Sequence, residues 1–336
     1  MSNSHSTKAA LFYEYSPEDG DVFGRGRRER IEGLTCLYPN VITGVNFDQH
    51  ANALADVEVI FATWGIPSFD DHHFDAMPNL KAVFYAAGNV KSFASPLIKR
   101  DIKLIGAWDV NAIPVAEMCL SQMLLSLRGY FRATRNYANL NTHDAKRFPR
   151  SGVFGETVGL IGLGKIGTRL RNLLAAFPIK VIAHDPFLTE KRAVELKVES
   201  VSLNEIFERS LVISSHIPDL ESTIGTLDGS HFKTMRDGAT FINSGRGAQL
   251  VEEDLIRVLQ GRPDITALLD VTFPEPPPST SELWSLPNVV ISPHIGGTVG
   301  DEAVRLADCM IDEYERWNAG KPLNYQITAD VFHTMG

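Results

Sequence analysis

Cysteine is scarce in this sequence of 336 residues. The three cysteines, Cys36, Cys119 and Cys309, lie far apart and form no Cys-x-x-Cys pair. Their number and spacing are typical of reduced thiols and argue against a disulfide-stabilised scaffold. Cys119 lies among apolar residues of an expected helix, so we expect it to fill part of a core.

Long apolar runs and an excess of basic charge are also missing. No stretch approaches a membrane span, and the polar start, Met1 to Lys8, lacks the apolar region of a signal peptide. The formal net charge of −9 argues against nucleic acid or an anionic membrane as the main partner. One basic run, Arg25 to Arg30, is interrupted by Glu29 and is interpreted as a solvated helix face. We therefore expect a cytoplasmic protein.

The first part of the chain alternates short apolar runs with helix-like segments. Two of these segments, Phe47 to Leu54 and Phe69 to Met77, have polar faces. The apolar runs contain β-branched or aromatic residues and predict buried strands. They are Ala9 to Tyr13, Val57 to Ala62, Leu80 to Tyr85 and Lys103 to Ala107. Strands that alternate with helices over short connections predict a small parallel α/β domain.

Two polar stretches of this first part are candidates for a ligand site. Asp70 to His73 is dense in metal-binding side chains, but neighbouring helical residues diverge by about 100° and cannot converge on one ion. We interpret that stretch as an exposed helix start and expect no metal. Ala87, Gly88 and Asn89 follow the run that ends at Tyr85. Backbone amides there could bind an anion, although an ordinary loop explains the same residues.

A long helix is expected to carry the chain from this first domain into a second. Asn111 offers a polar cap, with Pro114 in the first turn and an early acid at Glu117. Apolar residues from Ala116 to Leu127 follow at helical spacing and predict a buried face.

A glycine motif, Gly162-x-Gly164-x-x-Gly167, lies near the middle of the chain. An apolar, β-branched run precedes it and a helix-like pattern follows, and this order is typical of a turn that binds a dinucleotide pyrophosphate. The next apolar run, Lys180 to His184, leads to Asp185. An acid there accepts hydrogen bonds from both ribose hydroxyls of NAD and repels the extra phosphate of NADP. The glycines alone are weak evidence, but strand, glycines, helix and acid together predict an NAD site.

Four further strands are predicted, and a polar turn follows each. The strands are Leu211 to Ser214, Ala239 to Asn243, Ile265 to Asp270 and Val289 to Ser292. The turns are Ser215 to Pro218, Asn243 to Gly247, Asp270 to Glu275 and Pro293 to Gly297. Each turn has a structural explanation of its own. Ligands of a doubly wound sheet bind at the carboxyl ends of its strands, however, so the common location favours function.

Hydride transfer at a carbon that bears a hydroxyl is the chemistry these turns suggest. The reaction needs a group that takes or returns the hydroxyl proton, and histidine does this near neutral pH. Glu275, in the stiff run Pro274 to Pro278, is the candidate carboxylate to orient such a ring. Arg246 lies between two glycines and offers a forked cation for a substrate carboxylate. The proline run also fits a PxxP ligand of an adaptor domain, but we favour a rigid site loop.

The order and spacing of these motifs resemble the D-isomer-specific 2-hydroxyacid dehydrogenases over residues 110–300. The resemblance implies a Rossmann-type doubly wound parallel sheet domain, residues 113–298. This domain would be inserted into a flavodoxin-like α/β substrate domain made of residues 1–112 and 299–336. The implied activity is an NAD-dependent oxidoreductase that transfers a hydride between the cofactor and a D-2-hydroxy acid/2-keto acid pair. A homodimer is implied as well.

Residue roles follow from the same resemblance. It implies that His294 is the acid/base, Glu275 its carboxylate partner and Arg246 the residue that binds the substrate. Ala87, Gly88 and Asn89 would contribute to the substrate site. The cofactor would contact Gly162, Gly164, Lys165, Ile166, Gly167, Asp185, His216, Pro218, Thr223, Asn243, Ser244, Gly245, Asp270 and Gly297.

The sequence departs from the family pattern in two places. The usual Gly-x-Asp of the substrate loop is replaced by Gly88, Asn89, Val90 and Lys91, and Thr272 follows Val271 where the family usually has Phe. The particular substrate is therefore not inferred. Two alternatives remain open: a dehydrogenase-like scaffold that senses NAD(H) and acts through protein partners, as the related corepressors do, and an NADP-preferring reductase.

Overall fold

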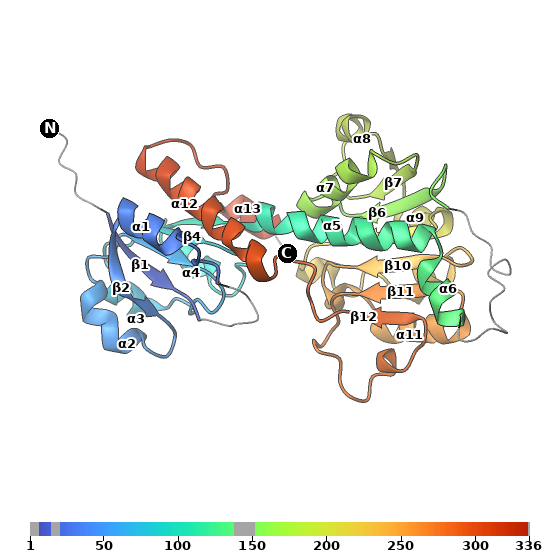
Figure 1. The fold of residues 1–336 in the computed structure, drawn as a ribbon, viewed down its shortest axis with the longest axis horizontal. Helices are drawn as coiled ribbons and strands as arrows, with labels where there is room; N and C mark the ends of the chain where they lie inside the picture. Colours follow the sequence, from blue (N-terminus) through green and yellow to red (C-terminus); the bar gives the residue numbers. More distant parts are fainter. Residues whose placement is uncertain (1–6, 15–20, 138–151, 335–336) are drawn as a thin grey trace. The chain divides into compact units, whose positions relative to one another are not determined.

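The computed structural model describes residues 7–14, 21–137 and 152–334. The chain divides into two compact units (Figure 1). Unit 1 comprises Met1–Asn111 and Thr298–Met335, and unit 2 comprises Ala112–Gly297, so that unit 2 is an insertion in the chain of unit 1. Each unit is built on a parallel sheet with helices, which confirms the predicted fold class.

Unit 1 contains a five-stranded parallel sheet in the order β2-β1-β3-β4-β5. This is the flavodoxin-like strand order. The strands are β1 (Lys8–Phe12), β2 (Cys36–Ile42), β3 (Val59–Ala62), β4 (Ala82–Tyr85) and β5 (Lys103–Gly106). The helices are α1 (Arg27–Leu34), α2 (Phe47–His50), α3 (Asp71–Ala76), α4 (Ala94–Lys99), α12 (Val304–Asn318) and α13 (Ala329–Thr334), with short 3₁₀ turns at Ala51–Leu54 and Gly300–Ala303.

β2 is the strand of unit 1 that the sequence analysis did not predict. It lies at the edge of the sheet and contains Pro39, and its register with β1 shifts between Ala9 and Leu11. An edge strand tolerates proline because one side of its backbone has no ladder partner. Most of its side chains are at least partly exposed, so the apolar run that marks a buried strand is missing.

α12 brings the C-terminal part of the chain back onto the sheet of unit 1, against β4 and β5 (Figure 1). The ring of Tyr314 packs edge-on against Phe61 and Phe84, with centroids 5.3 and 5.6 Å apart. All three rings are fully buried. The core of unit 1 therefore includes residues from both ends of the chain.

The basic run from Arg25 to Arg30 is exposed or partly exposed, as predicted, but its arginines are paired with acids. Arg27 forms two hydrogen bonds with the carboxylate of Asp308, at 2.9 and 2.7 Å. Arg30 pairs with Asp312 and Glu315 at 2.7 and 3.0 Å. The prediction did not include these ion pairs, because the acids lie on α12, far away in the sequence.

The stretch Asp70 to His73 forms the start of α3, as predicted. Asp70 caps the helix, since its carboxylate accepts a hydrogen bond from the backbone N–H of His73 at 3.2 Å. The ring Nδ1 of His73 lies 2.5 Å from the same carboxylate oxygen. The backbone N–H of Asp70 in turn donates to Nδ1 of His73 at 3.4 Å, so the two residues form a reciprocal helix cap.

Unit 2 contains a seven-stranded parallel sheet in the order β12-β11-β10-β9-β6-β7-β8. The chain starts in the middle at β6, runs outward to β8, and returns to β9 on the other side, as in a Rossmann fold. The strands are β6 (Thr157–Ile161), β7 (Lys180–His184), β8 (Glu199–Ser200), β9 (Val212–Ser215), β10 (Thr240–Asn243), β11 (Thr266–Leu269) and β12 (Val289–Ile291). The helices are α6 (Tyr130–Asn136), α7 (Lys165–Leu174), α8 (Glu190–Leu196), α9 (Leu203–Arg209), α10 (Gly229–Lys233) and α11 (Glu252–Gly261), with 3₁₀ turns at Glu221–Thr223, Gly247–Gln249 and Glu282–Trp284.

α5 (Trp108–Leu127) connects the two units and starts earlier than predicted. Its backbone is already helical at Asn111, whose N–H donates to the carbonyl of Ala107 at 3.0 Å. Pro114 therefore lies inside the helix. Asn111 does not cap α5; its side-chain oxygen accepts a hydrogen bond from the backbone N–H of Thr298 at 3.0 Å.

α5 also corrects the expectation that no stretch approaches a membrane span. By length and composition alone, its 20 residues are long and apolar enough to cross a membrane. Cys119 and Met123 are fully buried in the core of unit 2, together with residues of β6 and β7. The apolar stripe of α5 therefore packs on the sheet, and Cys119 fills part of the core, as predicted.

Candidate active site

All seven strands of the unit 2 sheet are parallel and therefore end at one edge, and candidate segments follow six of them, β12, β11, β10, β9, β6 and β7. In spatial order the segments that follow these strands are Pro293–Gly297, Asp270–Glu275, Asn243–Gly247, His216–Pro218, Gly162–Gly167 and Asp185. All predicted site residues of unit 2 lie in these segments, except Thr223, which follows His216–Pro218 in the chain. The carboxyl edge is where a doubly wound sheet binds its ligand.

The glycine turn connects β6 to α7. A Cβ on Gly162, whose φ is +87°, would lie 2.7 Å from the carbonyl oxygen of His216, and a Cβ on Gly167 would lie 2.1 Å from the carbonyl oxygen of Gly162. The fold therefore requires both glycines. A Cβ on Gly164 would meet nothing within 4 Å, so this glycine leaves open space beside the start of α7. Lys165 and Ile166 form the first turn of that helix, at the positive end of its dipole.

Asp185 follows β7 directly and contacts the glycine turn. One carboxylate oxygen accepts a hydrogen bond from the backbone N–H of Leu163 at 2.7 Å, and the other accepts from the N–H of Phe187 at 2.8 Å. Each carboxylate oxygen can accept more than one hydrogen bond. The carboxylate is thus fixed beside the phosphate turn and can still accept hydroxyl donors, which fits the ribose of NAD.

His216 lies at the end of β9 with its ring turned into the core. Its Nε2 lies 3.0 Å from the hydroxyl of Ser214, and its Nδ1 lies 3.2 Å from the hydroxyl of Ser244. Burial lowers the pKa of His216 to about 4, so the ring is neutral at pH 7. Burial likewise raises the pKa of Cys119, whose thiol donates to Ser244, to about 11. Neither group is ionised at neutral pH, and both are already hydrogen-bonded.

The segment that follows β9 is closed by its own side chains. The hydroxyl oxygen of Thr223 lies 2.7 Å from the carbonyl oxygen of Pro218 and 2.8 Å from that of Leu220. The predicted cofactor residues Pro218 and Thr223 therefore belong to one compact turn beside the glycine motif.

The turn after β10 carries Arg246. Asn243 shapes this turn, since its side chain accepts from the N–H of Gly245 and donates to the carbonyl of Arg246, both at 3.1 Å. The guanidinium of Arg246 donates to the carbonyl of Gly245 at 2.8 Å. Within the described ranges the structure shows no carboxylate paired with Arg246. The remaining donors of its fork can therefore bind an anion.

Arg246 lies beside the loop that carries Glu275. A Cβ on Gly247 would lie 2.0 Å from the carbonyl carbon of Thr272 and 2.5 Å from the nitrogen of Phe273. Only glycine allows the two backbones to approach this closely. The structure thus brings the Arg246 turn into contact with the segment between Asp270 and Glu275.

Glu275 and His294 form the pair that we predicted. Nδ1 of His294 lies 2.6 Å from a carboxylate oxygen of Glu275, and both side chains are partly exposed. Because Nδ1 is engaged, Nε2 is the ring nitrogen that remains for a substrate. The pair is therefore arranged for proton transfer at an accessible position.

Asp270 holds the segment around His294. Its carboxylate accepts hydrogen bonds from the hydroxyl of Ser292 at 2.6 Å and from the backbone N–H groups of Ile295 and Gly296 at 2.9 and 2.8 Å. The three donors lie on either side of His294 in the chain, and together they use both oxygens of the carboxylate. The structure therefore shows Asp270 supporting the histidine loop, a contact that the sequence did not reveal.

Ala87, Gly88 and Asn89, the predicted substrate loop, belong to unit 1. Ala87 is fully buried. A Cβ on Gly88 would lie 3.3 Å from the side-chain nitrogen of Asn111. The side chain of Asn89 accepts a hydrogen bond from the backbone N–H of Lys91 at 2.9 Å and thereby shapes the loop.

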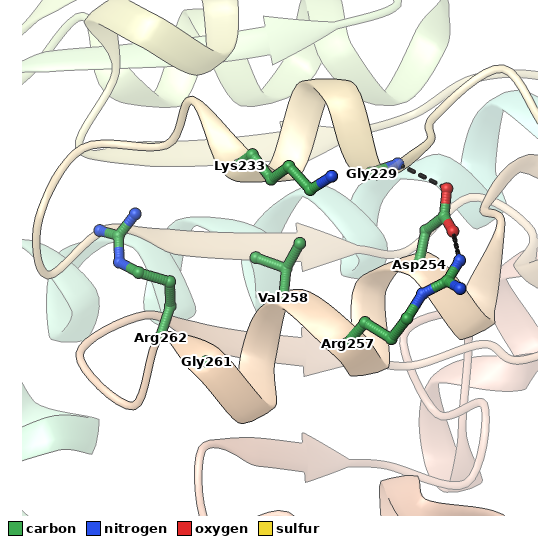
Figure 2. Close-up of a pocket in the computed structure, with 7 residues that line it drawn as sticks. All are labelled: Gly229, Lys233, Asp254, Arg257, Val258, Gly261 and Arg262. Carbon is green, nitrogen blue, oxygen red and sulfur yellow. Dashed lines mark hydrogen bonds and ion pairs between the residues drawn. The ribbon is translucent and has the colours of Figure 1, made fainter.

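Unit 2 also contains a pocket between α10 and α11, away from the predicted residues. Figure 2 shows its lining by Lys233, Arg257 and Arg262, with Asp254 bonded to both Arg257 and the backbone N–H of Gly229. Arg262 pairs with Asp237 and Asp264. Both arginines are thus neutralised, and none of the predicted site residues lines the pocket. The edge of the sheet remains the candidate active site.

A glycine turn with an acid beyond it, a forked cation and a histidine held by a carboxylate define a class of protein. They are the parts of a nicotinamide-dependent dehydrogenase of the doubly wound type. A family model described as "D-isomer specific 2-hydroxyacid dehydrogenase, NAD binding domain" matches residues 120–296. The chain belongs to the D-isomer-specific 2-hydroxyacid dehydrogenase family, which confirms the resemblance.

Relatives agree with this assignment. YoaD of Bacillus subtilis, named as a 2-hydroxyacid dehydrogenase, is 32% identical over 266 residues, which are 76% of each chain. D-3-phosphoglycerate dehydrogenase of Archaeoglobus fulgidus is 29% identical over 259 residues, which are 77% of this chain but 49% of that protein. The present chain thus matches about half the length of that enzyme. Apo D-mandelate dehydrogenase of Rhodotorula graminis has the same fold, with a TM-score of 0.77 at 21% identity over 96% of this chain and 97% of the other.

The protein is accordingly an NAD-dependent oxidoreductase that acts on a D-2-hydroxy acid/2-keto acid pair. The comparisons support this activity and not the alternative of a sensor scaffold.

Proposed function

We propose that Arg246, Glu275 and His294 carry this reaction at the carboxyl edge of the unit 2 sheet. The observation that supports the proposal is the 2.6 Å hydrogen bond between His294 and Glu275. The segment that carries Glu275 packs against the Arg246 turn. Arg246 binds the substrate carboxylate with its fork, because a planar guanidinium matches the two carboxylate oxygens. This contact places the substrate oxygen at C2 near His294.

His294 donates or accepts the proton of the reaction, depending on its direction. In the direction of reduction, Nε2 of His294 donates a proton to the C2 oxygen of the keto acid, which becomes the hydroxyl group. Bound NADH supplies the hydride that forms the new C–H bond at C2. Glu275 keeps the ring oriented through Nδ1 and offsets the positive charge that the ring carries before it donates. In the direction of oxidation the same nitrogen accepts the proton.

The cofactor residues follow the same edge. Gly164, Lys165 and Ile166 would hold the pyrophosphate, Asp185 would hold the ribose, and Asp270 would contribute at the nicotinamide end. The turns at His216–Pro218, Thr223 and Asn243–Gly245, together with Gly297, would contact the cofactor between these ends. We assign the dinucleotide-binding domain to residues 113–298.

The substrate domain is assigned to residues 1–112 and 299–336, with Ala87, Gly88 and Asn89 contributing backbone amides to the substrate anion. We further propose a cytoplasmic homodimer. The symmetric dimer is the commonest assembly of soluble proteins, and the acidic net charge of −9 disfavours nucleic acid and anionic membranes as partners.

A panel of 2-keto acids tests the proposed function. Glyoxylate, hydroxypyruvate, pyruvate and longer 2-keto acids are assayed with NADH and, separately, with NADPH. We expect turnover of at least one keto acid with NADH and weaker turnover with NADPH, because Asp185 repels the extra phosphate. Tight binding of NADH without turnover of any keto acid would contradict the proposal and favour a sensor.

A further inference from the structure

The side chain of Gln249 connects two turns of the candidate active site. Gln249 ends the 3₁₀ turn Gly247–Gln249 and is 1% exposed. Its oxygen accepts a hydrogen bond from the backbone N–H of Arg246 at 3.0 Å. Its nitrogen donates to the carbonyl oxygens of Ile217 and Pro218 at 2.9 and 3.0 Å. One buried amide therefore joins the Arg246 turn to the turn after β9.

The packing around this amide leaves little room for movement. A Cβ on Gly245 would lie 3.0 Å from the side-chain oxygen of Gln249 and 3.1 Å from the carbonyl oxygen of Ile217. A second hydrogen bond connects the same two turns, since the hydroxyl of Ser244 lies 3.2 Å from Nδ1 of His216. The backbone from Ser244 to Arg246 is thus held from both ends against the turn after β9.

The position of the Arg246 guanidinium depends on this turn. The guanidinium donates to the carbonyl of Gly245, which belongs to the same turn, at 2.8 Å. Within the described part of the chain no acidic side chain pairs with it. A shift of the Ser244–Arg246 backbone would therefore carry the guanidinium with it.

We propose that Gln249 is a positioning residue for Arg246 and thereby controls how well the enzyme recognises the carboxylate of its substrate. This inference rests on the proposed role of Arg246 in binding that carboxylate. Gln249 acts through the Arg246 turn and does not contact the substrate. Removing its amide takes the buried partner from the N–H of Arg246 and from the carbonyl of Ile217, whereas the carbonyl of Pro218 keeps the hydroxyl of Thr223.

The test compares a 2-keto acid with the corresponding 2-keto amide. For wild type we measure kcat/KM for the best keto acid of the panel and for its amide, with pyruvate and pyruvamide as the first pair. Gln249→Met has a similar volume but makes none of the three hydrogen bonds. We expect this variant to lower the acid-to-amide ratio of kcat/KM by roughly tenfold or more, mainly through the KM of the acid. The side chain in Gln249→Asn is shorter and reaches either the Arg246 turn or the turn after β9, but not both. This variant should therefore give an intermediate ratio.

Asn288→Leu is the matched control for a purely structural effect. Asn288 is also a 1% exposed amide, and its nitrogen donates to the carbonyls of Leu259 and Arg262 at 3.0 and 3.2 Å, away from the Arg246 turn. We expect Asn288→Leu to lower the thermal midpoint and to keep the acid-to-amide ratio of wild type. If the ratio falls equally in Gln249→Met and Asn288→Leu, the role of Gln249 is structural only and the inference is wrong.

Arg246→Lys separates this inference from the proposed function. If Arg246→Lys keeps the acid-to-amide ratio, Arg246 does not bind the carboxylate, and the proposed function and the inference fail together. If the acid-to-amide ratio falls in Arg246→Lys but stays at the wild-type value in both Gln249 variants, only the inference on Gln249 fails. Should Gln249→Met not fold, the ratio in Gln249→Asn decides.

Discussion

The carboxylate of Asp270 accepts a hydrogen bond from the backbone N–H of Gly296 at 2.8 Å, just beyond His294. Its other oxygen accepts from the N–H of Ile295 at 2.9 Å. The backbone of His294 has a φ of +54°, a left-handed conformation that costs a residue with a Cβ roughly 1–2 kcal/mol. Asp270 therefore helps to hold the histidine in a conformation that the loop alone would not favour.

We predict that Asp270→Asn lowers kcat roughly 10- to 100-fold. The amide group places an NH₂ opposite one of the N–H donors, so that this side of the loop loses its acceptor. Ser292→Ala removes only the hydroxyl donor and should have a smaller effect. Steady-state kinetics of both variants check this, and a wild-type kcat in Asp270→Asn would show that the loop keeps its position without the carboxylate.

His294→Ala should lower turnover by roughly 10²–10⁴-fold, while NADH still binds. The substitution removes the group that transfers the proton but leaves the glycine turn and Asp185 in place. His72→Ala is the matched control, since His72 also pairs with an acid, Asp48, at 2.8 Å, but in unit 1 and outside the site. Turnover is measured by the loss of NADH absorbance and binding by NADH fluorescence. Near-normal turnover of His294→Ala would remove this residue from the mechanism.

Asp185→Asn should weaken the preference for NAD over NADP. The amide removes the negative charge that repels the 2′-phosphate, and its oxygen can still accept from the backbone N–H of either Leu163 or Phe187. The ratio of kcat/KM for NADH to that for NADPH measures the preference, with the thermal midpoint as a check on folding. An unchanged ratio would mean that other residues select the cofactor.

His216 should make the protein less stable in mild acid. Burial lowers the pKa of His216 from an ordinary value of 6.5 to about 4. Between these two values the unfolded chain binds a proton at this side chain and the folded chain does not, so a falling pH favours unfolding. The expected loss of unfolding free energy from this residue between pH 7 and pH 5 is about 2 kcal/mol. Urea unfolding at both pH values, compared between wild type and His216→Gln, measures it; an equal pH dependence in the two proteins would contradict the prediction.

The sequence predicted most of the sheet edge because local patterns determine it. Buried parallel strands are short apolar runs, and the polar residues that follow them must lie at the same edge. The proximity of Glu275 and His294 follows from this rule, since β11 and β12 are neighbours. The glycines at 162 and 167 are required by contacts that any dinucleotide turn of this kind makes.

What the sequence did not predict depends on contacts between distant residues. β2 lacks an apolar run and is held in place by β1, and the partners of Arg27 and Arg30 lie on α12. Gln249 could have been noticed as a polar residue just after the Arg246 turn, but only the structure shows that it reaches the turn after β9.

The return of α12 to the first sheet has a consequence for the order in which the protein folds during synthesis. Met310, Ile311 and Tyr314 complete the core that also contains Phe61 and Phe84, so the N-terminal strands leave the ribosome long before their partner helix exists. Unit 2 is contained in one continuous segment and has its whole core available earlier. Domains usually fold from the N-terminus during translation, but here the whole chain of the inserted unit is available first, and one of the two core clusters of unit 1 is complete only after α12 has been made.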